Sequence, residues 1–333
     1  MQEIRGKEQV AVITGASAGV GRAVALRLAR EGWRVGLIAR DAAALRRLAE
    51  EIRAIGSEAL PLPCDVADAE AVFKAAAEAE RIFGHIDAWV NCAMVTIFAP
   101  VRDMSAEEFR RVTEVTYLGY VHGTMAALRH MRRADAGTIL QVGSALAYRS
   151  IPLQSAYCGA KHAIVGFTES LRSELRHENS GIRVTEVHLP AVNTPQFSWA
   201  RTRLPFQPRP AGTPITPDTA ARAVVAALRH PAREYWLGLS TFVAILGDMM
   251  MPGLADRYLA RTAVEGQMDR IPLVAPREGN LFKPVQGLHG VNGRFDGREG
   301  APCISGGMAR FGAATAALLA ACGLGVLIGR RGR

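Results

Sequence analysis

Residues 141–161 of the chain read QVGSALAYRSIPLQSAYCGAK. The stretch begins inside an apolar, β-prone run that starts at Thr138, and this run predicts a buried strand. Ser144 follows at the carboxyl end of that strand, and a helix is predicted to begin shortly afterwards. Tyr157 and Lys161 are four residues apart, so on this helix they share one face.

These three side chains together predict acid–base chemistry at a carbonyl or alcohol group. A free tyrosine has a pKa of about 10, too high for ready proton exchange at neutral pH. A neighbouring ammonium group such as that of Lys161 is expected to lower the pKa of Tyr157. Ser144 can then hydrogen-bond the substrate oxygen whose proton Tyr157 gives or takes. The Tyr-x-x-x-Lys spacing alone is weak evidence, because a surface tyrosine packed on a lysine stem has the same spacing.

Towards the amino terminus, residues 15–21 read GASAGVG and form a second candidate site. They follow a short buried strand, 10–14, and precede a helical run, 22–30. Glycines let the backbone approach a pyrophosphate, and the amino terminus of a helix favours its negative charge. Although an ordinary strand-to-helix turn also favours glycine, three glycines in this context predict dinucleotide binding.

The second predicted strand, 34–39, ends at Arg40. An acidic residue near this place binds the ribose hydroxyls of NAD, whereas an arginine suits the 2′-phosphate of NADP. Arg40 therefore favours NADP(H) over NAD(H) as the cofactor, the alternative being a plain surface charge. Asp41 is expected to act as the N-cap of the next helix, 42–55.

Further strands alternate with helices along the rest of the chain. The predicted strands are 59–65, 86–91, 138–142, 182–188 and 234–237. This alternation predicts an α/β fold: a Rossmann-type, doubly wound parallel sheet of about seven strands, covered by helices on both faces. Ligands bind such sheets beyond the carboxyl ends of the strands. Six notable residues fall at those ends, namely Gly15, Arg40, Asp65, Asn91, Ser144 and Pro190.

From about Gln9 to Leu239 the chain resembles the classical short-chain dehydrogenases/reductases. The matching pieces are Thr14-Gly15-x-x-x-Gly19-x-Gly21, Asp65-Val66, Asn91-x-Ala93, Ser144, Tyr157-x-x-x-Lys161 and the turn from Pro190 to Thr194. The resemblance implies NAD(P)-dependent oxidoreduction between an alcohol and a ketone or aldehyde, and a homodimer or homotetramer.

The resemblance also implies roles for individual residues. Tyr157 would be the general acid/base, Lys161 would lower its pKa and hold the nicotinamide ribose, and Ser144 would orient the substrate oxygen. Asp65 and Val66 would lie near the adenine, Asn91 and Ala93 near the ribose, and Thr194 near the nicotinamide carboxamide. The full cofactor-binding set would be Gly15, Ser17, Gly19, Val20, Gly21, Arg40, Asp65, Val66, Asn91, Ala93, Tyr157, Lys161, Pro190 and Thr194.

Two positions depart from the family pattern. Met94 stands where the family usually has a glycine after the fourth strand. Thr116 aligns with an asparagine that supports a water relay to the catalytic lysine in the family. A hydroxyl can bond backbone or water but cannot reproduce an amide, so Thr116 is only a candidate for that catalytic position.

Residues 196–216 and 240–259 are candidate substrate-binding segments. The first is rich in proline and arginine and is predicted to be a lid, or else an ordinary surface loop. The second is apolar and rich in methionine. Such a segment suits a lipophilic substrate, with core packing and a dimer contact as alternatives.

The chain is expected to comprise a catalytic domain at 1–260, a linker or poorly ordered segment at 261–307, and an apolar helix at 308–333. Residues 311–328 read FGAATAALLAACGLGVLI and carry no charge. Because a membrane crossing takes about twenty residues, this run is a candidate membrane anchor. The alternative is a helix buried in an oligomer interface.

Composition indicates the cellular compartment of the protein and the classes of partner that it is not expected to bind. The short polar amino terminus does not resemble a signal peptide, and the five cysteines have no metal spacing, so a reduced, cytoplasmic protein without a metal is expected. The net charge is +9, but no long basic run is interleaved with aromatics, so nucleic-acid binding is not expected. The competing function is a dinucleotide-binding regulatory or scaffold protein with little or no turnover.

Overall fold

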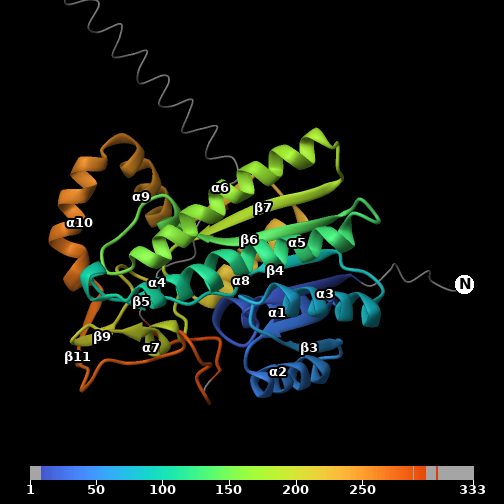
Figure 1. Cartoon of the computed structure of the whole chain (residues 1–333), viewed down its shortest axis with the longest axis horizontal. Coiled ribbons are helices and arrows are strands. Elements are labelled where there is room, and N and C mark those ends of the chain that lie inside the picture. The colour runs from blue at the N-terminus through green and yellow to red at the C-terminus, as the bar shows by residue number, and fades with distance from the viewer. Residues whose placement is uncertain (1–8, 288, 298–304, 307–333) are drawn as a thin grey trace, which may run out of the picture.

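The computed structural model describes residues 9–287, 289–297 and 305–306. Within these residues the main sheet has eight strands in the spatial order β12-β10-β7-β6-β4-β1-β2-β3. Seven of them pair in parallel: β1 (Val10–Thr14), β2 (Arg34–Ala39), β3 (Ala59–Pro63), β4 (Ala88–Asn91), β6 (Gly137–Ser144), β7 (Ile182–Leu189) and β10 (Glu234–Leu237). The eighth, β12 (Ser305–Gly306), pairs antiparallel with β10. The predicted doubly wound α/β sheet is confirmed (Figure 1).

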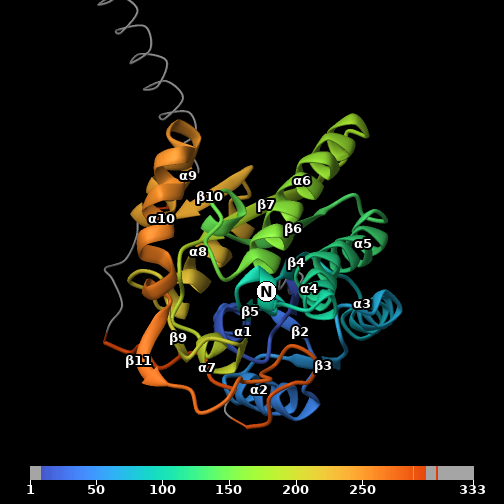
Figure 2. The same ribbon diagram turned by 60° about the vertical axis from the view of Figure 1, so that its left-hand side comes forward.

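Helices cover both faces of this sheet. In Figure 2, α1 (Gly19–Arg30) and α8 (Pro217–Arg229) lie to the left of the strands. On the opposite side lie α3 (Ala69–Phe83), α4 (Ala106–Thr113), α5 (Gly119–Met131) and α6 (Ser155–His177). The remaining helix of the first half, α2 (Ala42–Ala54), packs with α1 in the same apolar cluster.

Alternating residues of each strand supply the two apolar layers. In β1, Ala11 and Ile13 join the cluster formed with α1, α2 and α8, whereas Val12 joins the cluster formed with α3, α5 and α6. Successive side chains of a strand point to opposite faces, so a strand buried on both faces must be apolar throughout. All five residues of β1 are accordingly buried. This packing fixes the strand ends that carry the site.

Local capping sets where the helices begin. The Asp41 carboxylate accepts a hydrogen bond from the Ala44 amide (2.9 Å), which confirms its predicted N-cap role for α2. Ser105 and Glu108 form a complete capping box at the start of α4. A π-helical turn (Glu114–Leu118) separates α4 from α5.

Smaller elements lie beside the carboxyl edge of the sheet, and most of them come from the later part of the chain. Two of these are short strands that pair in parallel, β5 (Ile97–Phe98) and β8 (Arg201–Thr202). A short helix, α7 (Gln196–Trp199), precedes β8, and β9 (Phe206–Pro208) pairs antiparallel with β11 (Met268–Pro272). Between them come α9 (Leu239–Met250) and α10 (Pro252–Gly266), drawn in orange in Figure 1.

The linker predicted at 261–307 is not what the structure shows for the described part of that range. The Arg277 amide donates to the Thr202 carbonyl (3.1 Å), and the Asn280 amide donates to the Trp199 carbonyl (2.9 Å). Leu281 is fully buried, and Phe295 is 4% exposed. The buried residues of this range are not regularly spaced in the sequence, so the sequence pattern is that of a linker. The predicted helix at 308–333, with the candidate anchor 311–328, lies outside the described residues.

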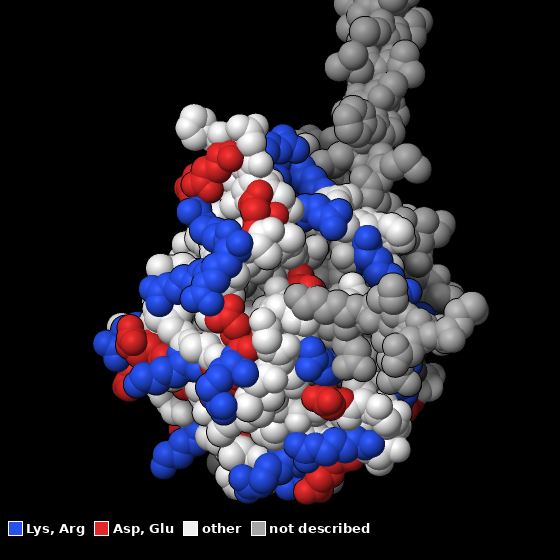
Figure 3. Space-filling view, turned by 90° about the vertical axis from the view of Figure 1, so that its right-hand side faces the viewer, with Lys and Arg blue, Asp and Glu red and all other residues white. Residues whose placement is uncertain are grey.

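No helix within the described residues is long and apolar enough to span a membrane. Surface charge on the face shown in Figure 3 is mixed, with basic and acidic side chains interspersed. The described residues also form ion pairs such as Arg132–Glu178 (2.9 Å) and Arg133–Glu80 (3.0 Å).

Candidate active site

A cleft of about 550 Å³ lies at the carboxyl ends of the parallel strands. This is the place where open α/β sheets bind ligands. Most of the residues predicted from the sequence line it, namely Gly15, Ser17, Gly19, Val20, Gly21, Arg40, Asp65, Val66, Ala93, Ser144, Tyr157, Lys161, Pro190 and Thr194. Two predicted residues, Asn91 and Thr116, are not in the lining.

The turn between β1 and α1 requires its glycines. Gly15 has a φ of +71°, and a Cβ on it would lie 2.7 Å from the Cα of Ala93. A Cβ on Gly21 would lie 2.3 Å from the carbonyl oxygen of Gly15. The backbone therefore forms a tight cradle at the amino terminus of α1, and such a cradle fits the pyrophosphate of a dinucleotide.

Ser144 and Tyr157 face the same part of the cleft. The Ser144 hydroxyl accepts a hydrogen bond from the Leu146 amide (3.1 Å), which holds the side chain at the end of β6. Burial raises the pKa of Tyr157, and the hydrogen bond from Ser144 only partly opposes that increase. The prediction that a neighbouring cation lowers the pKa of Tyr157 is therefore wrong for this structure, because burial outweighs the other influences.

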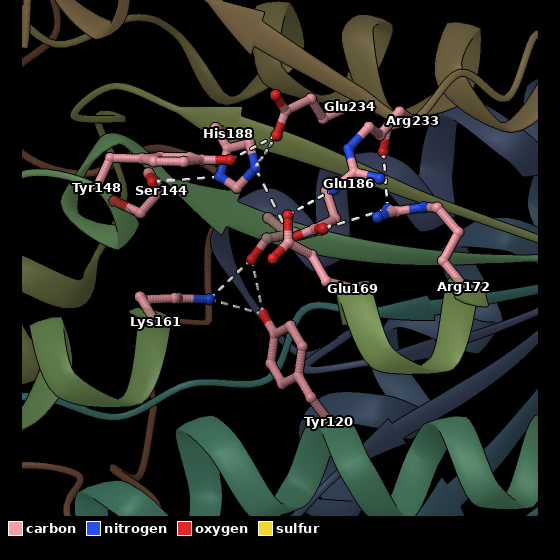
Figure 4. A network of polar contacts seen from close by, with 11 residues as sticks. Tyr120, Ser144, Tyr148, Lys161, Glu169, Arg172, Glu186, His188, Arg233 and Glu234 are labelled. Carbon is pink, nitrogen blue, oxygen red and sulfur yellow. Dashed lines mark hydrogen bonds and ion pairs between the residues drawn. The ribbon is translucent and has the colours of Figure 1, made fainter. Parts of the chain in front are cut away.

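The buried position of Lys161 makes its charged form less favourable than the sequence suggests. Its side chain is 2% exposed, and burial lowers its pKa to about 7, with Cys92 and Glu186 acting in the opposite direction. Its ammonium nitrogen lies 5.7 Å from the centre of the Tyr157 ring. The nearer partners are the Val142 carbonyl (2.7 Å) and the Tyr120 hydroxyl (2.9 Å), as Figure 4 shows for Lys161 and Tyr120.

Thr116 does not occupy the predicted relay position. It is fully buried, and its hydroxyl accepts from the Val95 amide (3.0 Å) and donates to the Val95 carbonyl (2.8 Å). These bonds tie the π-helical turn to the loop after β4. Tyr120, four residues later, contacts Lys161 instead. The sequence could have indicated Tyr120, because it lies four residues after Thr116 and residues four apart on a helix share a face.

Asn91 is also placed differently from the prediction. Its side chain is fully buried and donates to Gln141 (2.9 Å) and to Thr124 (3.1 Å), while it accepts from the Trp89 indole (2.9 Å). It therefore joins β4 to β6 and α5 rather than reaching the ribose side of the cleft. Met94, the departure from the family pattern after β4, lies in the lining with Cys92 and Ala93, so this loop shapes the cleft.

Residues 280–287 and 289–290, which we call the cover segment, run along the edge of the cleft beside α2 (Figure 2). The Arg40 guanidinium donates to the carbonyls of Asn280 (2.5 Å), Leu281 (3.3 Å) and Phe282 (3.1 Å). Arg111 bridges the Leu281 carbonyl and the carboxylate of Asp65. No sequence pattern pointed to these contacts.

The other end of the cover segment reaches the glycine turn. The Gly19 amide donates to the Gly290 carbonyl (3.0 Å). The His289 imidazole pairs with the Asp41 carboxylate (2.9 Å), and both side chains are almost completely buried. The cover segment thus contacts the two places, Arg40 and the glycine turn, where the sequence predicts the cofactor phosphates.

A buried polar network lies beside Ser144 (Figure 4). His188 is fully buried, with Nδ1 at 3.3 Å from the Ser144 carbonyl and Nε2 at 3.4 Å from the Glu234 carboxylate. The Tyr148 hydroxyl donates to the same carboxylate (2.5 Å). A Cβ on Gly143 would lie 2.5 Å from the His188 ring, so a glycine is needed there. The network therefore supports the strand end that presents Ser144.

Known proteins are similar to this chain over the part that carries the cleft. Residues 9–203 match the family model described as short chain dehydrogenase. The uncharacterized oxidoreductase YxnA of Bacillus subtilis is 35% identical over 285 residues, which cover 85% of this chain and 80% of that protein. The short-chain reductase protein NovJ of Streptomyces niveus is 38% identical over 198 residues, covering 60% of this chain and 74% of that protein.

A solved structure gives the same result. The alcohol dehydrogenase from the archaeon Thermococcus sibiricus, complexed with 5-hydroxy-NADP, matches with a TM-score of 0.61 and 30% identity, covering 69% of this chain and 96% of that chain. The family model spans more than half of the present chain, and the long match to YxnA extends beyond it. The chain is therefore an oxidoreductase that belongs to the short-chain dehydrogenase/reductase family.

Proposed function

We propose that the protein is an NADP(H)-dependent oxidoreductase that interconverts an alcohol and a ketone or aldehyde, with a lipophilic substrate. The observation that carries this proposal is that Ser144, Tyr157 and Lys161 line the same cleft as the glycine turn of residues 15–21. A dinucleotide held by that turn would lie along the strand ends that present the three side chains. The bound nicotinamide would supply or accept the hydride.

The side chains of this chain would handle the proton. Because burial raises the pKa of Tyr157, its phenol is protonated at neutral pH and suits donation to a carbonyl oxygen during reduction. The reverse reaction needs the same phenol as the acceptor. Ser144, at the end of β6, would hydrogen-bond the substrate oxygen and hold it towards Tyr157. Lys161 would fix the cofactor beside them.

Two arginines support the preference for NADP(H). Arg40, which lines the cleft, and Arg111, which is not in the lining, both donate to the Leu281 carbonyl. Guanidinium groups bind phosphate oxygens with two parallel hydrogen bonds, and such charge-assisted bonds are stronger than bonds to neutral carbonyls. A 2′-phosphate would therefore compete well for the donors that Arg40 gives to the cover segment.

The lining beyond Ser144 supports a lipophilic substrate. It includes apolar side chains on several elements, namely Met94, Val95, Leu146, Ile151 and Phe197, and it reaches Ala244 on α9 and Tyr258 on α10. The predicted lid segment, 196–216, contributes residues from α7 and from 210–213 to this lining. Apolar lining with a few polar groups is typical of pockets that bind mostly apolar molecules.

The test is oxidation of NADPH and of NADH with a series of aliphatic and aromatic ketones and aldehydes of increasing size. We expect turnover with NADPH and a rise in kcat/KM with apolar size. Arg40→Ala should lower kcat/KM for NADPH roughly 10- to 100-fold, as expected for the loss of a charged hydrogen bond, while the surface variant Arg46→Ala leaves it unchanged. Equal use of NADH and NADPH by the unaltered protein would contradict the cofactor assignment.

A further inference from the structure

Tyr120 contacts Lys161, and both residues line the cleft. The Tyr120 hydroxyl oxygen lies 2.9 Å from the Lys161 ammonium nitrogen, and that nitrogen lies 4.5 Å from the centre of the Tyr120 ring. The Tyr120 side chain is 1% exposed and comes from α5, whereas Lys161 comes from α6 (Figure 4). The hydrogen bond from Lys161 to Tyr120 thus joins α6 to α5 at the cleft wall.

While Lys161 is protonated, the hydrogen bonds in this contact have only one consistent direction, because an ammonium group cannot accept. The Tyr120 hydroxyl has a single proton, and it donates to the Val142 carbonyl (3.0 Å). The oxygen of Tyr120 can then only accept from Lys161. Lys161 also donates to the Val142 carbonyl (2.7 Å). Two of the three ammonium hydrogens are therefore committed on the strand side, and one is left for the cleft.

We propose that Tyr120 is a positioning residue for Lys161, which keeps the lysine protonated and directs its one remaining N–H into the cleft. This inference rests on the proposed function only in assuming that Lys161 acts on the cofactor. A hydrogen bond to the charged form of a group favours that form, so the Tyr120 hydroxyl opposes the effect of burial on the lysine.

The other groups that act on Lys161 come from three elements. Glu186 on β7 and Cys92 after β4 favour its charged form, while Tyr157 on α6 faces it through its ring. Burial raises the pKa of Tyr120 well above its ordinary value, so the Tyr120 hydroxyl stays neutral. Tyr120 therefore contributes a fixed dipole rather than a second titrating charge.

The variant Tyr120→Phe removes one oxygen atom and keeps the ring. The chain has four lysines, so ¹³C-labelling of lysine gives few signals, and the Lys161 signal is the one lost in Lys161→Arg. In the unaltered protein we expect this signal to titrate near pH 7, following the pKa lowered by burial. In Tyr120→Phe the midpoint should fall by about one pH unit, the equivalent of one hydrogen bond of about 1.4 kcal/mol.

The same shift should appear in the kinetics. The N–H donor is present below the pKa of Lys161 and is lost as the pH rises through it. The alkaline limb of kcat/KM should therefore move to lower pH in Tyr120→Phe, with weaker NADPH binding at pH 8. Tyr117→Phe, a half-buried tyrosine outside the cleft lining, is the control and should change neither quantity.

The titration separates this inference from the proposed function, because it needs no turnover. A lower midpoint in Tyr120→Phe supports the positioning role even if no substrate is found. An unchanged or higher midpoint, in a variant whose thermal unfolding matches that of the unaltered protein, would overturn it. Should Tyr120→Phe unfold early, Glu186→Gln tests the same balance, since removing that charge must also lower the midpoint if Lys161 is held protonated by its neighbours.

Discussion

Lys161 lies near two tyrosine rings, with its nitrogen 4.5 Å from the centre of the Tyr120 ring and 5.7 Å from that of the Tyr157 ring. The spacing of Tyr157 and Lys161 in the sequence correctly placed them on one helix, α6. The direction of the Tyr157 pKa could not be predicted in the same way. It depends on how completely β6, α5 and the loop after β4 exclude water, and these segments come from distant parts of the chain.

A buried lysine with a lowered pKa should reduce stability, and this gives a prediction for Lys161→Met. The unfolded chain holds the Lys161 proton up to about pH 10, whereas the folded protein releases it near pH 7. The cost of burying the charge is therefore full below pH 7, decreases as the pH rises from 7 to 10, and is absent above. We expect Lys161→Met to raise the free energy of unfolding by a few kcal/mol at neutral pH.

The measurement is chemical unfolding of both proteins at several pH values. The advantage of Lys161→Met should be largest at and below pH 7 and should shrink towards pH 10. A constant difference across this range would mean that the charge of Lys161 carries no such cost. Activity should be lost in the variant at every pH, as expected where a functional group is buried at the expense of stability.

At the scale of the elements, local sequence patterns predicted the helices and strands well, but they did not predict the cover segment. Asp41 starts its helix as predicted, because capping depends on residues within one turn. The cover segment is fixed by bonds such as that from Arg40 to Asn280, which joins residues 240 positions apart. Such contacts have no periodicity, so the sequence suggested a linker there.

The cover segment should control how fast the cofactor leaves. His289 pairs with Asp41 (2.9 Å) and packs edge-on against Trp199, with 5.1 Å between the ring centres. His289→Ala removes both contacts at the cleft edge, so the segment should open more often. We expect NADPH to dissociate several-fold to about tenfold faster, consistent with the loss of one charged hydrogen bond.

Stopped-flow fluorescence of bound NADPH measures this rate directly. His177→Ala, on the exposed end of α6, is the matched control and should release NADPH at the rate of the unaltered protein. If His289→Ala also shows an unchanged rate, the cover segment does not gate the cofactor.

Across the whole molecule, the sheet topology brings the glycine turn at residue 15 and the tyrosine at residue 157 into one cleft. The sequence predicted this because ligands bind beyond the carboxyl ends of parallel strands. The structure adds that β1, β4 and β6 are neighbours in the sheet. The sequence-based prediction misplaced Asn91 because alternation along β4 turns that side chain into the interior, while the residues after it line the cleft. Which side chains of a strand end face a ligand depends on this local geometry.

The central claim is that Tyr157 transfers the proton at a substrate oxygen beside a dinucleotide held by the glycine turn. Tyr157→Phe tests it most directly, because the variant keeps the ring and removes only the hydroxyl. NADPH affinity, measured by fluorescence titration, should stay within a few-fold of that of the unaltered protein, while kcat for carbonyl reduction falls by about 10²- to 10⁴-fold, as expected for loss of a general acid. Retention of full kcat in Tyr157→Phe would contradict the account.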